Sequence, residues 1–168
     1  MKTDVLVIGG GPAGMSAALS ASQNNSKVVL VERDHVLGGI LNQCIHNGFG
    51  LHYFKEELTG PEFAHRFREM VEKDKNIKVL TNTLVTTFGE KKVSVIGEKG
   101  AFDISFKACI IAMGCRERTA GNINLNGTRP MGVITAGTAQ KMVNIDGKML
   151  GKDVVILGSG DIGLNMGR

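Results

Sequence analysis

Residues 4–14, DVLVIGGGPAG, decide how this chain folds. Residues 4–8 form a short apolar run, unbroken and rich in β-branched side chains, which is typical of a strand buried on both faces of a parallel sheet. Three glycines follow, and Pro12 suits the first turn of a helix because that position needs no backbone N–H. A second apolar run, KVVLVE at 27–32, comes after the helix. The segment therefore predicts a strand–turn–helix–strand unit.

The spacing of the glycines is that of a turn that binds phosphates. Gly9 permits a tight turn, Gly11 lets a pyrophosphate approach the backbone, and Gly14 lets the helix pack closely on the strand. The helix N-terminus adds unpaired N–H groups and a partial positive charge. Glu32 ends the second strand, where a carboxylate can accept hydrogen bonds from the ribose hydroxyls of an adenosine. The sequence thus predicts a dinucleotide site, and the motif fits FAD and NAD alike because both contain ADP.

The remaining elements follow from apolar patterns and turn residues. Thr59 and Glu62 have the spacing of a capping box and predict the start of a second helix. The glycines within residues 97–100 predict a hairpin turn. Strands are expected at 77–80, 84–88, 92–96, 101–106, 108–112, 133–136 and 154–157, and a short helix at 137–145.

The order of these elements predicts an α/β fold of the Rossmann-like three-layer type, a parallel sheet with helices and an inserted antiparallel β-meander at about 77–106. Residues 1–150 would form a first nucleotide-binding domain. Residues 151–168 would begin a second one, because a buried strand leads there into another glycine motif at 158–163. A parallel strand without neighbours cannot bury its faces, so we expect a truncated fold, the front part of a longer protein.

Composition excludes several classes of protein. A hydrophobic content of 42% and a charged content of 21% are those of a soluble globular protein. The net charge is +4, but the basic residues are interleaved with acids, so no stretch predicts a nucleic-acid partner. No apolar stretch approaches the length of a membrane span. The cysteines are sparse and odd in number, which argues against a disulfide framework and favours a reducing, cytoplasmic location.

Five ordered motifs resemble those of a known flavoprotein superfamily. They are DVLVIGGGPAGMSAA, VVLVER, GGILNQC, CIIAMG and VVILGSGDIG, and they are similar to motifs of the pyridine nucleotide-disulfide oxidoreductases, which have two dinucleotide domains and include thioredoxin reductase. In that superfamily the first glycine motif takes FAD and the internal one takes NAD(P)H. Residues 114–140 look like the FAD/NAD(P) subunits found beside glycerol-3-phosphate dehydrogenase-like proteins, and like the alpha subunits of opine oxidases and cyanide synthase. Such subunits often work with a second flavoprotein or an iron–sulfur protein.

The resemblance implies a function and a set of contacts. The function is that of a flavin-dependent oxidoreductase, which transfers hydride or electrons between NAD(P)H and FAD and then to a small-molecule or protein partner. The fragment is expected to be inactive alone, because in the superfamily a later segment completes the flavin site. Arg33 would join Glu32 at the ribose, Gly38 and Gly39 would bring the backbone close to the pyrophosphate, and the backbone of Val85 would meet the adenine. The implied FAD contacts are Gly9, Gly10, Gly11, Pro12, Ala13, Gly14, Glu32, Arg33, Gly38, Gly39, Ile40, Leu41, Asn42, Val85, Ala112, Met113 and Gly114, and the implied NAD(P) contacts are Gly158, Gly160 and Gly163.

The resemblance departs from the disulfide reductases at the cysteines. The long type of these enzymes places two closely spaced cysteines just after the Gly-Gly pair, whereas here Cys44 stands alone. Cys44 is either a lone redox thiol near the flavin, and then the candidate catalytic residue, or a packing residue of the flavin loop. No catalytic acid, base or nucleophile is otherwise assigned. With His46 and His52, Cys44 lacks the spacing of zinc ligands, so no metal is expected.

Two other functions stay open. One is a non-catalytic electron-transfer subunit that holds FAD and turns over nothing by itself. The other is an FAD-dependent tRNA-modifying enzyme, since such proteins share a similar N-terminus. The internal second glycine motif argues against the tRNA-modifying enzyme, and so does the absence of a basic stripe.

Overall fold

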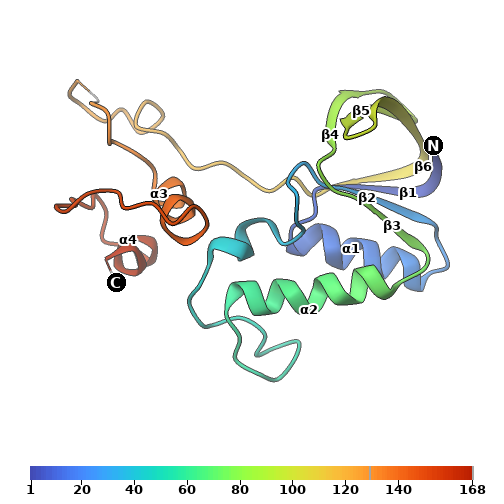
Figure 1. Cartoon of the computed structure of the whole chain (residues 1–168), viewed down its shortest axis with the longest axis horizontal. Helices are drawn as coiled ribbons and strands as arrows, with labels where there is room; N and C mark the ends of the chain where they lie inside the picture. The colour runs from blue at the N-terminus through green and yellow to red at the C-terminus, as the bar shows by residue number, and fades with distance from the viewer. Residues whose placement is uncertain (129, 168) are drawn as a thin grey trace. The chain divides into compact units, whose positions relative to one another are not determined.

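The computed structural model describes residues 1–128 and 130–167, and the chain divides into two compact units, Met1–Gly114 and Cys115–Arg168. The first unit contains a six-stranded sheet with the strand order β3-β2-β1-β6-β5-β4 (Figure 1). Its strands are β1 (Lys2–Ile8), β2 (Val28–Val31), β3 (Ile77–Leu80), β4 (Leu84–Phe88), β5 (Lys92–Gly97) and β6 (Gly100–Ile111). Its helices are α1 (Pro12–Gln23), the 3-10 helix η1 (Gly39–Gln43) and α2 (Gly60–Lys73), and the second unit holds α3 (Ala136–Asn144) and α4 (Asp161–Met166).

The sheet is parallel in one half and antiparallel in the other. β1 pairs in parallel with both β2 and β6, and β2 pairs in parallel with β3. β5 pairs antiparallel with both β4 and β6. The predicted strand–turn–helix–strand unit is therefore confirmed. Because β3 belongs to the parallel half, the antiparallel meander consists of β4, β5 and the first half of β6.

β6 corrects one expectation about the strands. The two strands expected at 101–106 and 108–112 are a single strand, so that prediction was wrong. The first half of β6 pairs with β5, and the second half pairs with β1 on the opposite edge. Lys107 lies between the two apolar runs without interrupting the strand, because its side chain is 81% exposed. One strand thus joins the meander to the parallel sheet.

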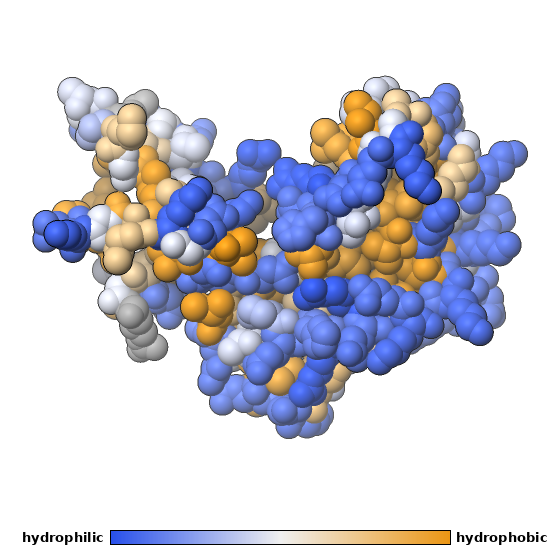
Figure 2. All heavy atoms as spheres, in the orientation of Figure 1, coloured by the Kyte–Doolittle hydropathy of each residue, from blue (hydrophilic) through white to orange (hydrophobic). Residues whose placement is uncertain are grey.

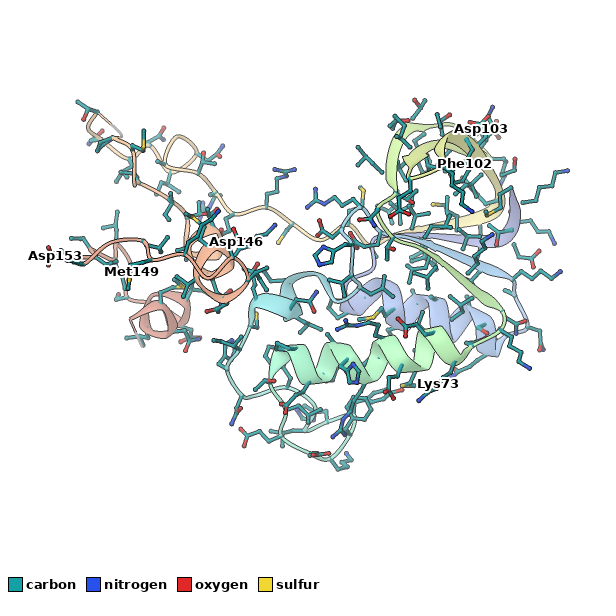
Figure 3. The ribbon with its side chains drawn as sticks, viewed as in Figure 1. Lys73, Phe102, Asp103, Asp146, Met149 and Asp153 are labelled. Carbon is teal, nitrogen blue, oxygen red and sulfur yellow. The ribbon has the colours of Figure 1, made fainter. Side chains whose placement is uncertain are left out.

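The core lies on both faces of the sheet. α1 and α2 cover one face and the meander lies over the other (Figure 1). Val7 belongs to the cluster on the helix side, and Leu6 and Ile8 belong to the cluster on the meander side. The unbroken apolar run is therefore buried on both faces, as predicted. Side chains of β6 alternate in the same way, since Phe102 packs against the core and the exposed Asp103 pairs with a lysine (Figure 3).

α2 begins with the capping box that the sequence predicts. The Thr59 hydroxyl accepts a hydrogen bond from the backbone N–H of Glu62 at 3.4 Å, and the Glu62 carboxylate accepts one from the N–H of Thr59 at 2.7 Å. Phe67 and Val71 are buried on the face of α2 that packs on the core. The capping box fixes where the helix starts, and the apolar stripe fixes which face is buried.

The second unit confirms one element and corrects two. α3 forms where a short helix was expected. The strands expected at 133–136 and 154–157 do not form, so those two predictions were wrong. Val155 is 95% exposed and Leu157 is 77% exposed, and apolar atoms lie at the surface of this unit (Figure 2). The described part of this unit contains no strand beside them, and a strand needs a neighbour for its hydrogen bonds and its apolar faces.

Candidate dinucleotide site

The first glycine turn joins β1 to α1 through close contacts between backbones. Gly9 has a φ of +104°, in the left-handed region that favours glycine. A Cβ atom at Gly9 would overlap the carbonyl oxygen of Ala112, and a Cβ atom at Gly14 would overlap the carbonyl oxygen of Gly9. Packing alone therefore requires glycine at both positions, and the packing role predicted for Gly14 is confirmed.

Gly11 differs from its neighbours because packing does not require glycine there. No heavy atom lies within 4 Å of a Cβ atom built at Gly11, among those compared across the turn. Its φ of −73° is one that any residue adopts. The space beside Gly11 is therefore open, and it lies at the N-terminus of α1, where backbone N–H groups and the helix dipole favour an anion.

The two long helices of the first unit differ at their N-termini. The Thr59 and Glu62 side chains cap α2, and the hydrogen bonds that Glu62 accepts from the backbone and hydroxyl of Thr59 hold the pKa of its carboxyl below the ordinary value. α1 begins after Gly11, which provides no side chain to cap the helix. The N-terminus of α1 is therefore the one left available to a ligand.

The adjacent glycines Gly38 and Gly39 lie against the first glycine turn. The backbone N–H of Gly38 donates to the carbonyl oxygen of Gly10 at 2.8 Å. A Cβ atom at Gly39, where φ is +54°, would lie 3.1 Å from the Cα atom of Gly11. The Asn42 side chain packs on Gly38 and donates to the carbonyl oxygen of Leu37 at 3.2 Å. Glycines that are distant in sequence thus meet beside the open N-terminus of α1.

Glu32 holds the first turn from the end of β2. Its side chain is buried, at 8% exposure, and one carboxylate oxygen accepts a hydrogen bond from the N–H of Gly10 at 2.6 Å. The other oxygen accepts one from the N–H of Asp34 at 2.9 Å. A carboxylate has about four lone-pair sites, so acceptor capacity remains for a ligand. The bond to Gly10 could not be predicted from the sequence, because a motif of spaced glycines does not show which backbone N–H contacts the carboxylate.

The other predicted contacts differ in their surroundings. Ala112 belongs to the turn, because its N–H donates to the carbonyl oxygen of Ile8 at 2.8 Å and its own carbonyl faces Gly9. Arg33, Ile40 and Met113 are exposed. Leu41 is buried, and Val85 packs against the core cluster on the meander side. Ala13 and Gly114 are also exposed, and Pro12 is partly buried. All of these residues stay predictions as ligand contacts. Leu41 and Val85 in addition contribute to the packing of the unit.

Cys44 is partly buried beside Gly60, where a Cβ atom would lie 2.9 Å from the Cβ atom of Cys44. Its carbonyl oxygen accepts a hydrogen bond from the N–H of Gly60 at 3.0 Å. Burial raises the pKa of the Cys44 thiol, which favours the unreactive thiol over the thiolate. Within residues 1–128 and 130–167 no group of three or more metal-ligating side chains gathers. In the same ranges no helix has the length and apolarity needed to cross a membrane.

The second glycine motif repeats the local geometry of the first within the second unit. Gly158 has a φ of +133°, and a Cβ atom at Gly163 would overlap the carbonyl oxygen of Gly158. A Cβ atom at Gly160 would have no heavy atom within 4 Å among those compared. The helix that follows, α4, spans six residues and has no buried residue. The second glycine turn is therefore formed, but in the described part of this unit no strand precedes it and the helix that follows it is not packed.

The chain is similar in sequence to a known family of oxidoreductases and to several of its relatives. Residues 3–168 match the family model of the pyridine nucleotide-disulphide oxidoreductases. A dihydrolipoyl dehydrogenase of Manduca sexta is 30% identical over 98% of this chain and 37% of its own length. A hydrogen cyanide synthase subunit, HcnB, of Pseudomonas protegens is 26% identical over 96% of this chain and 34% of its own length.

The solved structure of an L-proline dehydrogenase from P. horikoshii matches 99% of this chain with a TM-score of 0.80 and 26% identity. The match covers 33% of that protein. The chain therefore spans about a third of the length of each of these three proteins.

Proposed function

The chain belongs to the pyridine nucleotide-disulphide oxidoreductase family, and from this premise we propose that residues 9–14 and their neighbours hold the ADP part of FAD. The observation that carries the proposal is the open space beside Gly11 at the uncapped N-terminus of α1. The pyrophosphate of FAD would lie there, between the N-terminus of α1 and the backbone of Gly39. Glu32 would accept hydrogen bonds from the ribose while it holds Gly10 in place.

The proposed activity is that of an oxidoreductase that passes hydride between NAD(P)H and FAD. FAD supplies the redox chemistry when it is bound, and the protein supplies position and electrostatics. The second glycine turn, residues 158–163, is the proposed place for NAD(P)H, because its backbone conformation repeats that of the first turn. No side chain of the described residues is assigned a proton transfer.

The proposed electron acceptor is a partner subunit or a small molecule. A relative that is named as a subunit of hydrogen cyanide synthase supports a partner subunit, for which a second flavoprotein or an iron–sulfur protein is the proposed chemistry. The raised pKa of the Cys44 thiol supports a route that does not pass through this cysteine.

Titration of the purified full chain with FAD, followed by flavin fluorescence, tests the proposal. Gly11→Ala places a methyl group in open space, so we expect unchanged folding but an FAD affinity that falls by about tenfold or more, equivalent to about 1.4 kcal/mol. Gly160→Ala is the matched control, because this glycine also opens into free space with an ordinary φ of −79°. It should leave FAD affinity unchanged and weaken binding of NADH. Full FAD affinity in the Gly11→Ala variant would refute the assignment.

A further inference from the structure

A lysine-lined hollow lies at the opposite end of the parallel strands from the first glycine turn. Its volume is about 330 Å³, and its lining includes Lys2, Lys27, Lys75 and Lys78 together with Asn76. These residues lie at or near the starts of β1, β2 and β3, the end of the sheet that the N-terminus marks in Figure 1. A second hollow of about 380 Å³ adjoins it, and Lys2, Thr3 and Lys27 line both.

The four lysines of this hollow form no ion pair within the described part of the chain. No carboxylate in the described part of the chain lies within 4.0 Å of any of their ammonium groups, whereas other surface lysines do form ion pairs. The hollow has no acidic residue in its lining. Like charges on lysines that line one hollow repel one another in the free protein, and an anion would relieve that repulsion.

Three acidic residues at this end of the sheet have hydrogen-bonding or ion-pair partners. Asp4 lines the adjoining hollow, pairs with the Lys107 ammonium at 2.6 Å and accepts a hydrogen bond from the N–H of Lys27 at 2.9 Å. Asp74 accepts a hydrogen bond from the N–H of Asn76 at 2.9 Å. Asp103, labelled in Figure 3, pairs with the Lys92 ammonium at 2.9 Å. Asp4 and Asp103 are therefore each ion-paired with a lysine that does not line the hollow of about 330 Å³, whereas Asp74 keeps its negative charge because its N–H donor is neutral.

Several backbone groups at this edge are also occupied. The carbonyl oxygen of Lys27 accepts hydrogen bonds from the N–H groups of Asp4 and Val5 and from the Thr3 hydroxyl. The N–H of Val28 donates to the carbonyl oxygen of Asn76 at 2.9 Å. Recognition in the hollow would therefore rest on ammonium groups, which bind phosphates as point charges and do not discriminate the shape of a base or sugar.

We propose that this hollow binds an oligophosphate chain. Four lysines that line a hollow of about 330 Å³ suit a ligand that concentrates several negative charges on adjacent groups, and the volume lies at the lower end of small-ligand sites. The site is separate from the proposed FAD site, because β1 runs from Lys2 to Ile8 between them, roughly 20 Å at about 3.3 Å per residue. The ligand is a free oligophosphate or the phosphate chain of a nucleotide.

Calorimetric titration of the full chain, with FAD present in excess to occupy the glycine turn, tests this site. Tripolyphosphate and ATP are the probes, at low and at physiological ionic strength. The quadruple variant K2Q/K27Q/K75Q/K78Q should bind tripolyphosphate at least about 100-fold more weakly than the unchanged chain, and single variants about two- to fivefold more weakly. Binding to the unchanged chain should weaken as salt screens the ammonium groups.

The matched control is K55Q/K99Q/K141Q/K152Q, which removes the same net charge from exposed lysines outside both hollows. It should retain most of the affinity for tripolyphosphate. Equal affinity for tripolyphosphate and ATP identifies the phosphate chain alone as the ligand, and tighter binding of ATP identifies a nucleotide as its source. The proposal is overturned if the unchanged chain binds neither probe, if both quadruple variants lose affinity equally, or if a glutamate peptide of equal charge binds as tightly. Because the test rests on lysines remote from residues 9–14, its outcome is separate from that of the FAD titration.

Discussion

The two glycine turns have nearly the same backbone in very different surroundings. Gly9 and Gly158 have φ values of +104° and +133°, and each accepts the close approach of the glycine five positions later. The glycines that precede the two helices, Gly11 and Gly160, have φ values of −73° and −79° and make no side-chain cap. The conformation of the turn is therefore set by residues within the motif itself.

The layers around the two turns differ. The first turn follows a buried strand and opens a helix in which Met15 and Ala18 are completely buried. The second follows residues 154–157, which are exposed and form no strand, and it opens a helix without a buried residue. A local motif thus specifies a turn, while a strand and a packed helix need partners that lie elsewhere in the fold.

The largest effect that tests this comparison is expected from alanine at the last glycine of each turn. Gly14→Ala should lower the free energy of unfolding by about 3 kcal/mol, because its Cβ atom would overlap the Gly9 carbonyl in a packed layer that cannot move apart. Gly163→Ala creates the same local overlap, but its exposed surroundings can shift, so we expect less than about 1 kcal/mol. Urea unfolding followed by circular dichroism measures both. Equal losses would show that the second turn is packed as firmly as the first.

A smaller effect is expected from the acid that fixes only the first turn. Glu32→Gln keeps the size of the side chain but replaces one acceptor oxygen with an N–H₂ group that faces a backbone N–H, so we expect a loss of about 2 kcal/mol in unfolding free energy. FAD affinity should fall as well. Glu98→Gln is the control, because Glu98 accepts an exposed hydrogen bond from the Asn82 side chain. Its change should stay within about 0.5 kcal/mol. Equal changes in the two variants would mean that Glu32 does not hold the turn.

The sequence predicts best those elements whose cause is local. The helix that begins after Thr59 forms with its capping box, and the strand at 77–80 has the bounds that its apolar run predicts. The Rossmann-like fold is confirmed as well, because its signature is an order of local elements. Each of these follows from residues within a few positions of one another.

The sequence predicts poorly what depends on distant partners. The apolar run at 154–157 predicts a buried strand. In the structure these residues are exposed, because no described strand of their unit lies beside them. The single strand β6 could not be distinguished from two strands, because its halves have different neighbours. The bond from the Gly10 N–H to Glu32 joins residues 22 positions apart and leaves no periodic pattern in the sequence. The assignment of individual residues to FAD or NAD(P)H stays a prediction.

The smallest effect is expected at the exposed run itself, and it tests the comparison most directly. Val155→Thr changes a side chain that is 95% exposed, so the free energy of unfolding should change by no more than about 0.5 kcal/mol. Val29→Thr is the matched control, because Val29 is 4% exposed in β2 and the new hydroxyl would be buried, with an expected loss of about 1–2 kcal/mol. Both values come from the same urea titration as the alanine variants. If Val155→Thr were as destabilising as Val29→Thr, residues 154–157 would be packed like a strand in solution, and the difference in support between the two turns would disappear.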